Sequence, residues 1–323
     1  MKQITIWPCP INRGIVGLLR ITWIGWLQER GFFFLLAFMW MMPSLVYLFV
    51  WTTAAGSQTV GGLTRGAFVA YYLVLMVVNQ LTFAQTNWTV GDVIRTGGLN
   101  RLLLRPLSPF ADTVATELAG KGIYLLFVVP VVGLLTLVLR PEVTVTANNL
   151  FAFFPALLLA WLLRFLWGYW LALLAFWSTR ADALLGLQDT LVFLLAGQVA
   201  PVALLPGALQ IAAHYLPFRY MIGFPVEIFT NQLTGAEIMT GFGLQLGWIG
   251  VAFVLTRLLW RRGLDQYSAV GGGDARDSFD WHLYRAVGAA RTGLSFQLCG
   301  QPLLCAAQCG HWYSGADGNL WPG

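Results

Sequence analysis

Few residues in this chain have the types and spacing that support chemistry. Three cysteines and a histidine lie close together near the C-terminus, and thiolates with imidazole are ligands that zinc prefers. These residues are Cys299, Cys305, Cys309 and His311. Their spacing lacks the second matched pair of a structural zinc site, so we expect no bound metal. We also find no Ser, His and Asp set at one membrane depth, which disfavours an intramembrane enzyme.

The run ELAGKG at 117–122 comes nearest to a nucleotide-binding motif. A phosphate-binding loop has the pattern G-x-x-x-x-G-K-[ST], in which glycines let backbone amides surround the phosphates and the lysine contacts them. The run has the Gly-Lys pair but lacks both the upstream glycine and the following hydroxyl residue. We therefore expect this chain to bind no cofactor, and ATP, if it is used at all, to be bound elsewhere.

The most informative segment is residues 91–121, a basic and amphipathic stretch broken by glycines and prolines. Gly97 and Gly98 interrupt it, and Pro106 and Pro109 predict a turn around Ser108, so we expect two short helices joined by a corner. Leucines form one side of the segment and arginines the other. Such a helix either inserts into a cleft on a partner protein or rests on lipid, and the residues alone leave both open.

The elements around this segment are apolar runs. Hydrophobic residues make up 58% of the chain and charged residues only 10%, and the mean hydropathy is +0.68, values typical of a membrane protein. A helix needs about 20 apolar residues to cross a bilayer. Runs of this kind cover residues 32–51, 67–85, 122–139, 150–177, 186–205 and 241–260. They do not alternate polar and apolar residues, so we predict an all-α membrane protein with six transmembrane helices rather than a barrel.

The distribution of basic residues predicts the orientation. With the N-terminus inside, the inner loops carry twelve basic residues and the outer loops three. The inner set is Lys2, Arg13, Arg20, Arg30, Arg95, Arg101, Arg105, Lys121, Arg180, Arg257, Arg261 and Arg262, and the outer set is Arg65, Arg140 and Arg219. Both termini are therefore expected in the cytoplasm. Attraction to anionic lipid accounts for the net charge of +5, so we expect no nucleic-acid partner.

Three regions follow from this pattern. Residues 1–31 form a cytoplasmic N-terminus that contains an amphipathic helix, which lies in the membrane interface or packs on the rest of the protein. Residues 32–262 form the six-span transmembrane domain. Residues 263–323 form a polar, poorly ordered cytoplasmic tail, whose cysteines should stay reduced.

Some polar residues interrupt the apolar runs and are candidates for a gate or transport path. They are Arg164, Gln188, Asp189, Gln198 and Glu227. A charge at the centre of a span costs at least ~2.5 kcal/mol, so Arg164 either finds a partner in the protein or extends to the outer interface. Glu227 falls in the last outer loop, which we expect to form a re-entrant hairpin before the last span. There it either finds a partner or is a solvated turn residue, and His214 and Arg219 are expected to anchor the loop at the interface.

Three stretches together resemble one known family. They are GLNRLLLRPLSPF at 98–110 with ELAGKG after it, LPFRYMIGFPVEIF at 216–229, and WRRGLDQYSAVGG at 260–272. In this order they are similar to six-span permease subunits of type-2 ABC exporters, the multidrug or daunorubicin-type permeases. The resemblance covers about residues 10–273.

The resemblance implies a permease that pairs with separate ABC ATPase subunits and with a second permease, as a homodimer or heterodimer. It also implies that a cytoplasmic coupling helix between the second and third spans docks onto the ATPase. The positions that match are Arg95, Leu99, Arg101, Leu102, Arg105, Pro106, Leu107 and Pro109. The resemblance therefore implies a multi-pass protein of a bacterial inner membrane that exports a hydrophobic or amphiphilic substrate. An ion-coupled secondary transporter and a non-transporting scaffold are the alternatives.

Overall fold

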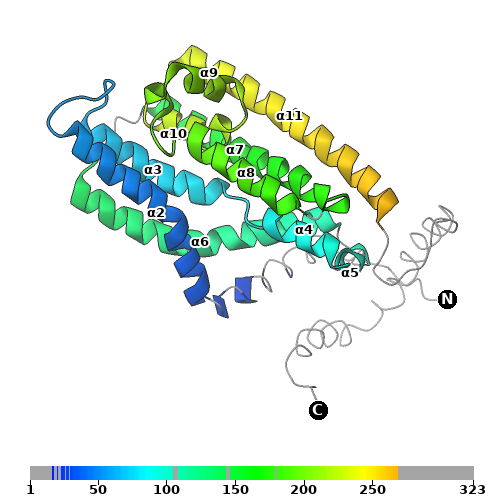
Figure 1. Cartoon of the computed structure of the whole chain (residues 1–323). Helices are drawn as coiled ribbons and strands as arrows, with labels where there is room; N and C mark the ends of the chain where they lie inside the picture. The colour runs from blue at the N-terminus through cyan, green and yellow to red at the C-terminus, as the bar shows by residue number, and fades with distance from the viewer. Residues whose placement is uncertain are drawn as a thin grey trace, which may run out of the picture. The chain divides into compact units, whose positions relative to one another are not determined.

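The computed structural model describes residues 30–104, 108–142, 146–178 and 180–267, and single positions between 17 and 28 that are helical. The chain divides into two units, Met1–Tyr267 and Ser268–Gly323. The second unit, with the cysteines and histidine discussed above, lies outside the described residues. The first unit is built from α-helices and short 3₁₀ helices (Figure 1).

The helices follow one another along the chain in this order. They are α2 (Arg30–Ala55), α3 (Arg65–Thr82), α4 (Asn87–Arg95), α5 (Leu99–Leu103), α6 (Pro109–Leu139), α7 (Ala147–Leu173), η1 (Leu174–Phe176), α8 (Ala181–Leu195), η2 (Val202–Leu204), α9 (Gly207–Tyr215), η3 (Arg219–Met221), α10 (Gly223–Phe229) and α11 (Gly235–Gln266). This architecture confirms the predicted all-α membrane class.

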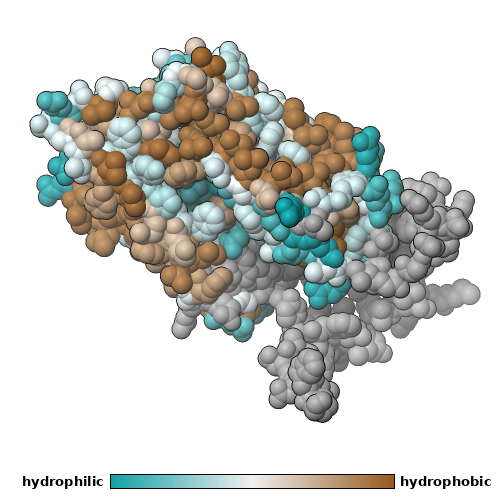
Figure 2. Space-filling view, in the orientation of Figure 1, coloured by the Kyte–Doolittle hydropathy of each residue, from teal (hydrophilic) through white to brown (hydrophobic). Residues whose placement is uncertain are grey.

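Five stretches of the described residues are long and apolar enough to cross a membrane. They are Phe34–Ala55, Arg65–Arg95, Pro109–Leu139, Ala147–Phe176 and Gly235–Gln266. In Figure 2, hydrophilic residues gather towards the two ends of this unit and hydrophobic residues cover much of the surface between them. An apolar middle with polar ends is the surface that a bilayer requires.

The loops at one end of the bundle are joined by polar contacts. The Thr64 hydroxyl donates to Glu142 Oε2 (2.6 Å), which connects the loop before α3 to the end of α6. Asn149 Nδ2 donates to Asn231 Oδ1 (2.7 Å), which connects the start of α7 to the loop before α11. We call this end the hairpin end, because the short helices α9 and α10 also lie there.

The opposite end contains α4 and α5, and we call it the elbow end. The start of α8 is joined to α4 there, and Phe176 at the end of α7 packs on Trp260 near the end of α11. Gln80, near the end of α3, donates to the carbonyl of Ala37 near the start of α2 (3.1 Å). Helices α2, α3, α6, α7, α8 and α11 therefore alternate in direction, and α2 begins at the same end at which α11 finishes.

Residues just before two helices explain where those helices begin. Ser108 caps α6 through its hydroxyl, and Pro109 occupies the first turn, where its missing N–H costs nothing. Thr234 and Glu237 form a reciprocal capping box at the start of α11. The predicted corner at Ser108 is thus the start of the third long helix.

Two predicted spans differ from the helices observed. The run at 67–85 is one helix, α3, which ends three residues early at Thr82, and α4 follows from Asn87. The run at 186–205 is wrong as a continuous helix, because α8 stops at Leu195 and Gly197 adopts a positive φ of 81°. With 15 residues, α8 is about 22 Å long, short of the roughly 30 Å of a bilayer core.

Helix α7 lies at the centre of the bundle. It packs against α11, α10, α4, α3 and α8, whereas α2 and α6 pack on α3. The main core joins aromatic side chains of α3, such as Phe68 and Tyr71, with α10 and the middle of α7. A second cluster joins α4 and α5 to the second half of α7 and to α11, so the elbow is attached to the central helix.

Candidate functional site

The elbow consists of α4 and α5, residues 87–103. Gly97 reverses the chain between α4 and α5 with a φ of 76°, a conformation that glycine adopts without strain. Leu99 is buried, whereas Asn100 and Arg101 are exposed on the other face of α5. The two short helices and their amphipathic faces were predicted, and the described residues confirm them.

A cavity of about 150 Å³ lies under the elbow. Apolar residues of α4 and α5 line one part of it, and hydroxyl groups of α4 and α6 line another. Leu102, Pro109 and Tyr169 are among its walls, and so is Trp260 at the end of α11. The elbow therefore covers a partly polar cavity lined by residues of α4, α5, α6, α7 and α11.

The break between α3 and α4 is held by side chains from α6. Lys121 donates to the carbonyl of Phe83, and Tyr124 donates to the side chain of Gln85. Glu117 accepts hydrogen bonds from the backbone N–H of Thr86 (3.0 Å) and from its hydroxyl (2.8 Å). Positions 117, 121 and 124 share one helix face, so α6 presents a row of polar groups to the break.

Glu117 and Lys121 of this row pair with backbone groups that have no helical hydrogen-bond partner where a membrane helix ends. Within a bilayer an unpaired carbonyl or N–H group costs several kcal/mol, roughly, so non-helical backbone needs partners. Glu117 and Lys121 also pair with each other, with 2.6 Å between Oε1 and Nζ, and both side chains are buried. We call Glu117, Lys121 and Tyr124 the α6 clamp.

Arg164 is buried next to the clamp and has partners on two other helices. Its Nη1 donates to Asn79 Oδ1 on α3 (2.9 Å), and its Nη2 lies 3.7 Å from Asp189 Oδ1 on α8. The guanidinium also stacks over the ring of Phe83 at 4.9 Å. With 3% exposure, Arg164 does not extend to the outer interface, and that alternative was wrong. The arginine instead joins α3, α7 and α8.

Aromatic side chains pair the non-helical backbone that follows α8. Tyr71 donates to the carbonyl of Gly197 (2.9 Å), and Tyr72 donates to the carbonyl of Val199 (3.1 Å). Trp51 on α2 donates to the same Val199 carbonyl (2.8 Å). These bonds explain how an apolar run can leave the helical path without exposing carbonyl groups to lipid.

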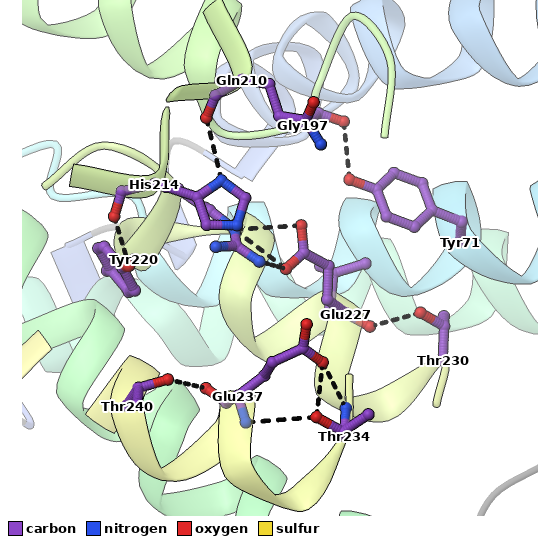
Figure 3. A network of polar contacts seen from close by, with 12 residues as sticks. Tyr71, Gly197, Gln210, His214, Tyr220, Glu227, Thr230, Thr234, Glu237 and Thr240 are labelled. Atoms are coloured by element: carbon purple, nitrogen blue, oxygen red, sulfur yellow. Dashed lines mark hydrogen bonds and ion pairs between the residues drawn. The ribbon is translucent and has the colours of Figure 1, made fainter. Parts of the chain in front are cut away.

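The hairpin segment, residues 196–230, contains a buried ion pair. Arg219 Nη2 donates to Glu227 Oε2 (2.6 Å), and its Nε donates to the same oxygen (3.1 Å). Arg219 is 7% exposed and Glu227 3%. Figure 3 shows the surrounding network, in which Tyr71 reaches Gly197 and the His214 ring contacts the Gln210 carbonyl.

Two expectations for this loop were therefore wrong. Arg219 does not anchor the loop at the interface, and Glu227 is not a solvated turn residue, because each is buried against the other. In the segment FRYMIGFPVE the arginine and the glutamate are eight positions apart. The chain folds back on itself through η3 and α10, which brings the two charges together. His214 remains exposed.

The other predicted residues are placed as follows. Gln188 is buried beside Asp189 on α8, with 3.4 Å between its Nε2 and Asp189 Oδ1, and Gln198 is buried in the turn after that helix. Arg95 donates to Asp92 and to Asp182. The docking candidates Arg105, Pro106 and Leu107 lie outside the described residues.

The clamp residues were not among the predicted sites, although the run ELAGKG drew attention for another reason. A glutamate and a lysine four positions apart inside a long apolar helix are a recognisable signal, because charges at such depth must pair. Among the described residues, no group of three or more His, Cys, Asp or Glu side chains is placed to hold a metal ion.

Comparison with known proteins adds one finding. A family model described as ABC-2 family transporter protein matches residues 38–271, which include the elbow, the clamp, Arg164 and the hairpin segment. No curated protein matches the chain. The match covers more than two thirds of the sequence.

Proposed function

The chain belongs to the ABC-2 family of transporter proteins, and from this membership we propose that it is the permease subunit of an exporter driven by separate ATPase subunits. As a multi-pass membrane component of an ABC transporter, it has no ATP-binding loop of its own in the sequence. ATP and Mg²⁺ then belong to the partner subunits. The substrate is hydrophobic or amphiphilic, and export proceeds across a bacterial inner membrane.

One observation supports the elbow as the contact for the ATPase. The short helix α5 presents Asn100 and Arg101 to solvent, while Leu99 holds it to the bundle. Because α5 is charged on its exposed face and packed on the bundle, it can transmit a force from a bound ATPase to the long helices. In the proposed complex Arg101, Leu102 and Arg105, with Pro106, Leu107 and Pro109, form this docking surface, and Arg95 and Leu99 support it.

The transport cycle follows from this arrangement. ATP-driven closure of the ATPase subunits moves the elbow, and the long helices tilt between inward-open and outward-open states. A second permease subunit completes the path, with both termini in the cytoplasm and six passes per chain, the fifth of which is made by α8 together with the non-helical residues that follow it. The hairpin segment enters the outer leaflet and serves as the gate. Arg164, Gln188 and Asp189 occupy the helices that would move, Gln198 lies in the turn after α8, and Glu227 occupies the gate.

A pulldown from native membranes tests the proposal. The intact protein should recover a nucleotide-binding ATPase, and the double variant Arg101→Glu, Arg105→Glu should recover at least about tenfold less, because like charges placed in an interface cost several kcal/mol. The matched control is Arg261→Glu, Arg262→Glu, which makes the same charge change at exposed positions near the end of α11. This control should recover the ATPase normally.

The other outcomes are also informative. Recovery of the ATPase with both double variants would keep the permease and reject the docking surface. If the intact protein recovers no ATPase under conditions that preserve known membrane complexes, the permease proposal fails and an ion-coupled transporter or a scaffold becomes the better account.

A further inference from the structure

Helix α4 has attachments of two different kinds. Towards α3 it continues through the non-helical residues 83–86, which the α6 clamp holds by side-chain bonds. Towards α7 and α8 it is packed directly. Asn87 Nδ2 donates to the carbonyl of Phe165 in the middle of α7 (2.9 Å). The attachment to α3 runs through a break in the helix, whereas the attachment to α7 and α8 is a continuous packing surface.

Gly91 lies where α4 packs on the segment that connects α7 to α8. A Cβ at this position would lie 3.6 Å from the Cβ of Ala175 in η1 and 3.4 Å from Asp182 Oδ1 in α8. Both distances are ordinary van der Waals contacts. One face of α4 therefore rests on the turn that connects α7 to α8.

An ion pair closes this surface at the far end of α4. Arg95 Nη2 donates to Asp182 Oδ2 in the first turn of α8 (2.7 Å), and the same guanidinium donates to Asp92 within α4. The arginine side chain is 21% exposed and that of Asp182 is 43% exposed. Such a charge-assisted bond fixes the geometry of two helix ends that have no backbone connection nearby.

We infer that α4, η1 and the start of α8 move as one rigid block, and that Arg95 and Asp182 are positioning residues that hold the block together. The joint between this block and α3 is the non-helical break at residues 83–86. A push on the elbow then moves the end of α7 and the start of α8, and the α6 clamp acts as the pivot. As an account of coupling, this inference rests on the proposed function.

The block is connected directly to the interior of the helix bundle. Helix α8 carries Asp189, which lies 3.7 Å from the guanidinium of Arg164. It ends just before Gly197, whose carbonyl accepts the hydrogen bond of Tyr71. A displacement of the start of α8 therefore reaches both the buried arginine and the backbone that begins the hairpin segment.

Hydrogen exchange on the purified chain in lipid nanodiscs tests the block without any ATPase. The variant Asp182→Asn should raise deuterium uptake roughly threefold in both 87–95 and 181–187, because a partly exposed ion pair contributes a modest free energy that both helices share. Uptake in 65–82 should not change. The matched control is Asp92→Asn, which removes the other carboxylate at Arg95 but leaves the link between helices.

Either of two results would overturn the inference. In the first, Asp182→Asn raises exchange in α8 alone, so the ion pair does not hold α4. In the second, Asp92→Asn raises exchange in both helices as much as Asp182→Asn does. The increase would then follow from the loss of any carboxylate near Arg95 and not from the loss of the link between α4 and α8.

A disulfide provides a second test. The variant Gly91→Cys, Ala175→Cys, in a chain whose native cysteines are replaced by serine, should cross-link readily, because 3.6 Å suits the Cβ separation of a disulfide. Added to Asp182→Asn, the cross-link should return uptake in 87–95 to the level of the intact protein, and reduction should remove this rescue. No rescue by a fully formed cross-link would contradict the block.

The same cross-link connects the block to coupling. In a complex with the ATPase, the oxidised protein should keep its response to ATP, because α4 and η1 move together. Loss of the response on oxidation, with recovery on reduction, would show that α4 slides against α7 and would overturn the inference. If no ATPase is found, the proposed function fails, and the exchange experiment still decides whether the block exists.

Discussion

Replacing Lys121 with methionine is expected to lower the unfolding temperature of the purified protein by roughly 10 °C. The substitution removes the cation that pairs with Glu117 and the donor that the Phe83 carbonyl uses. Glu117 is 3% exposed, so its carboxylate would remain buried without its direct ion-pair partner. Removing one partner of a buried pair costs about 3–5 kcal/mol. Thermal unfolding in detergent, followed by tryptophan fluorescence, measures the effect.

The double variant Glu117→Gln, Lys121→Met should recover much of this loss, because a glutamine can still accept hydrogen bonds from Thr86 and carries no charge. Leu137→Met on the lipid-facing side of the same helix is the control and should leave the unfolding temperature unchanged, since Leu137 is exposed. A fall of less than about 2 °C for Lys121→Met would mean that the clamp contributes little stability.

Replacing Arg219 with methionine should destabilise the protein by a similar amount, about 3–5 kcal/mol. Arg219 donates two hydrogen bonds to one carboxylate oxygen of Glu227, and both side chains are buried in the hairpin segment. Without the guanidinium, Glu227 would be left charged and unpaired among apolar residues. Chemical unfolding with a graded denaturant gives the free energy.

A neutral double variant separates the ion pair from the packing. Arg219→Met, Glu227→Leu should be more stable than Arg219→Met alone, because no buried charge remains. Glu237→Gln is the matched control for removing a carboxylate nearby, and it should cost under about 1 kcal/mol, since a glutamine can also complete the capping box. Equal stability of the single and double variants would rule out the pair as the cause.

The elbow shows how much of the site the sequence can predict. Gly97, Gly98 and Pro109 act locally, through backbone conformation, so their positions predict the break between α4 and α5 and the start of α6. The amphipathic pattern predicts that Leu99 is buried and Arg101 is exposed. Local rules suffice where the determinant and its effect lie within one turn.

The buried charges show where such rules stop. The sequence marks Arg164 as costly in a membrane, but its partners Asn79 and Asp189 come from other helices, and only the packing of α7 between α3 and α8 brings them together. The same holds for the helix expected at 186–205. Its composition stays apolar past Leu195, and distant side chains such as Tyr71 make the turn at Gly197 tolerable.

The central claim is that ATP bound by a separate subunit moves this chain as far as the hairpin segment. The most direct measurement is the distance between spin labels at Leu209 on α9 and Ala236 at the start of α11, both exposed, in the purified complex with its ATPase. Trapping with ATP and vanadate should shift the distance distribution relative to the nucleotide-free complex. An unchanged distribution in a complex that hydrolyses ATP would contradict the account.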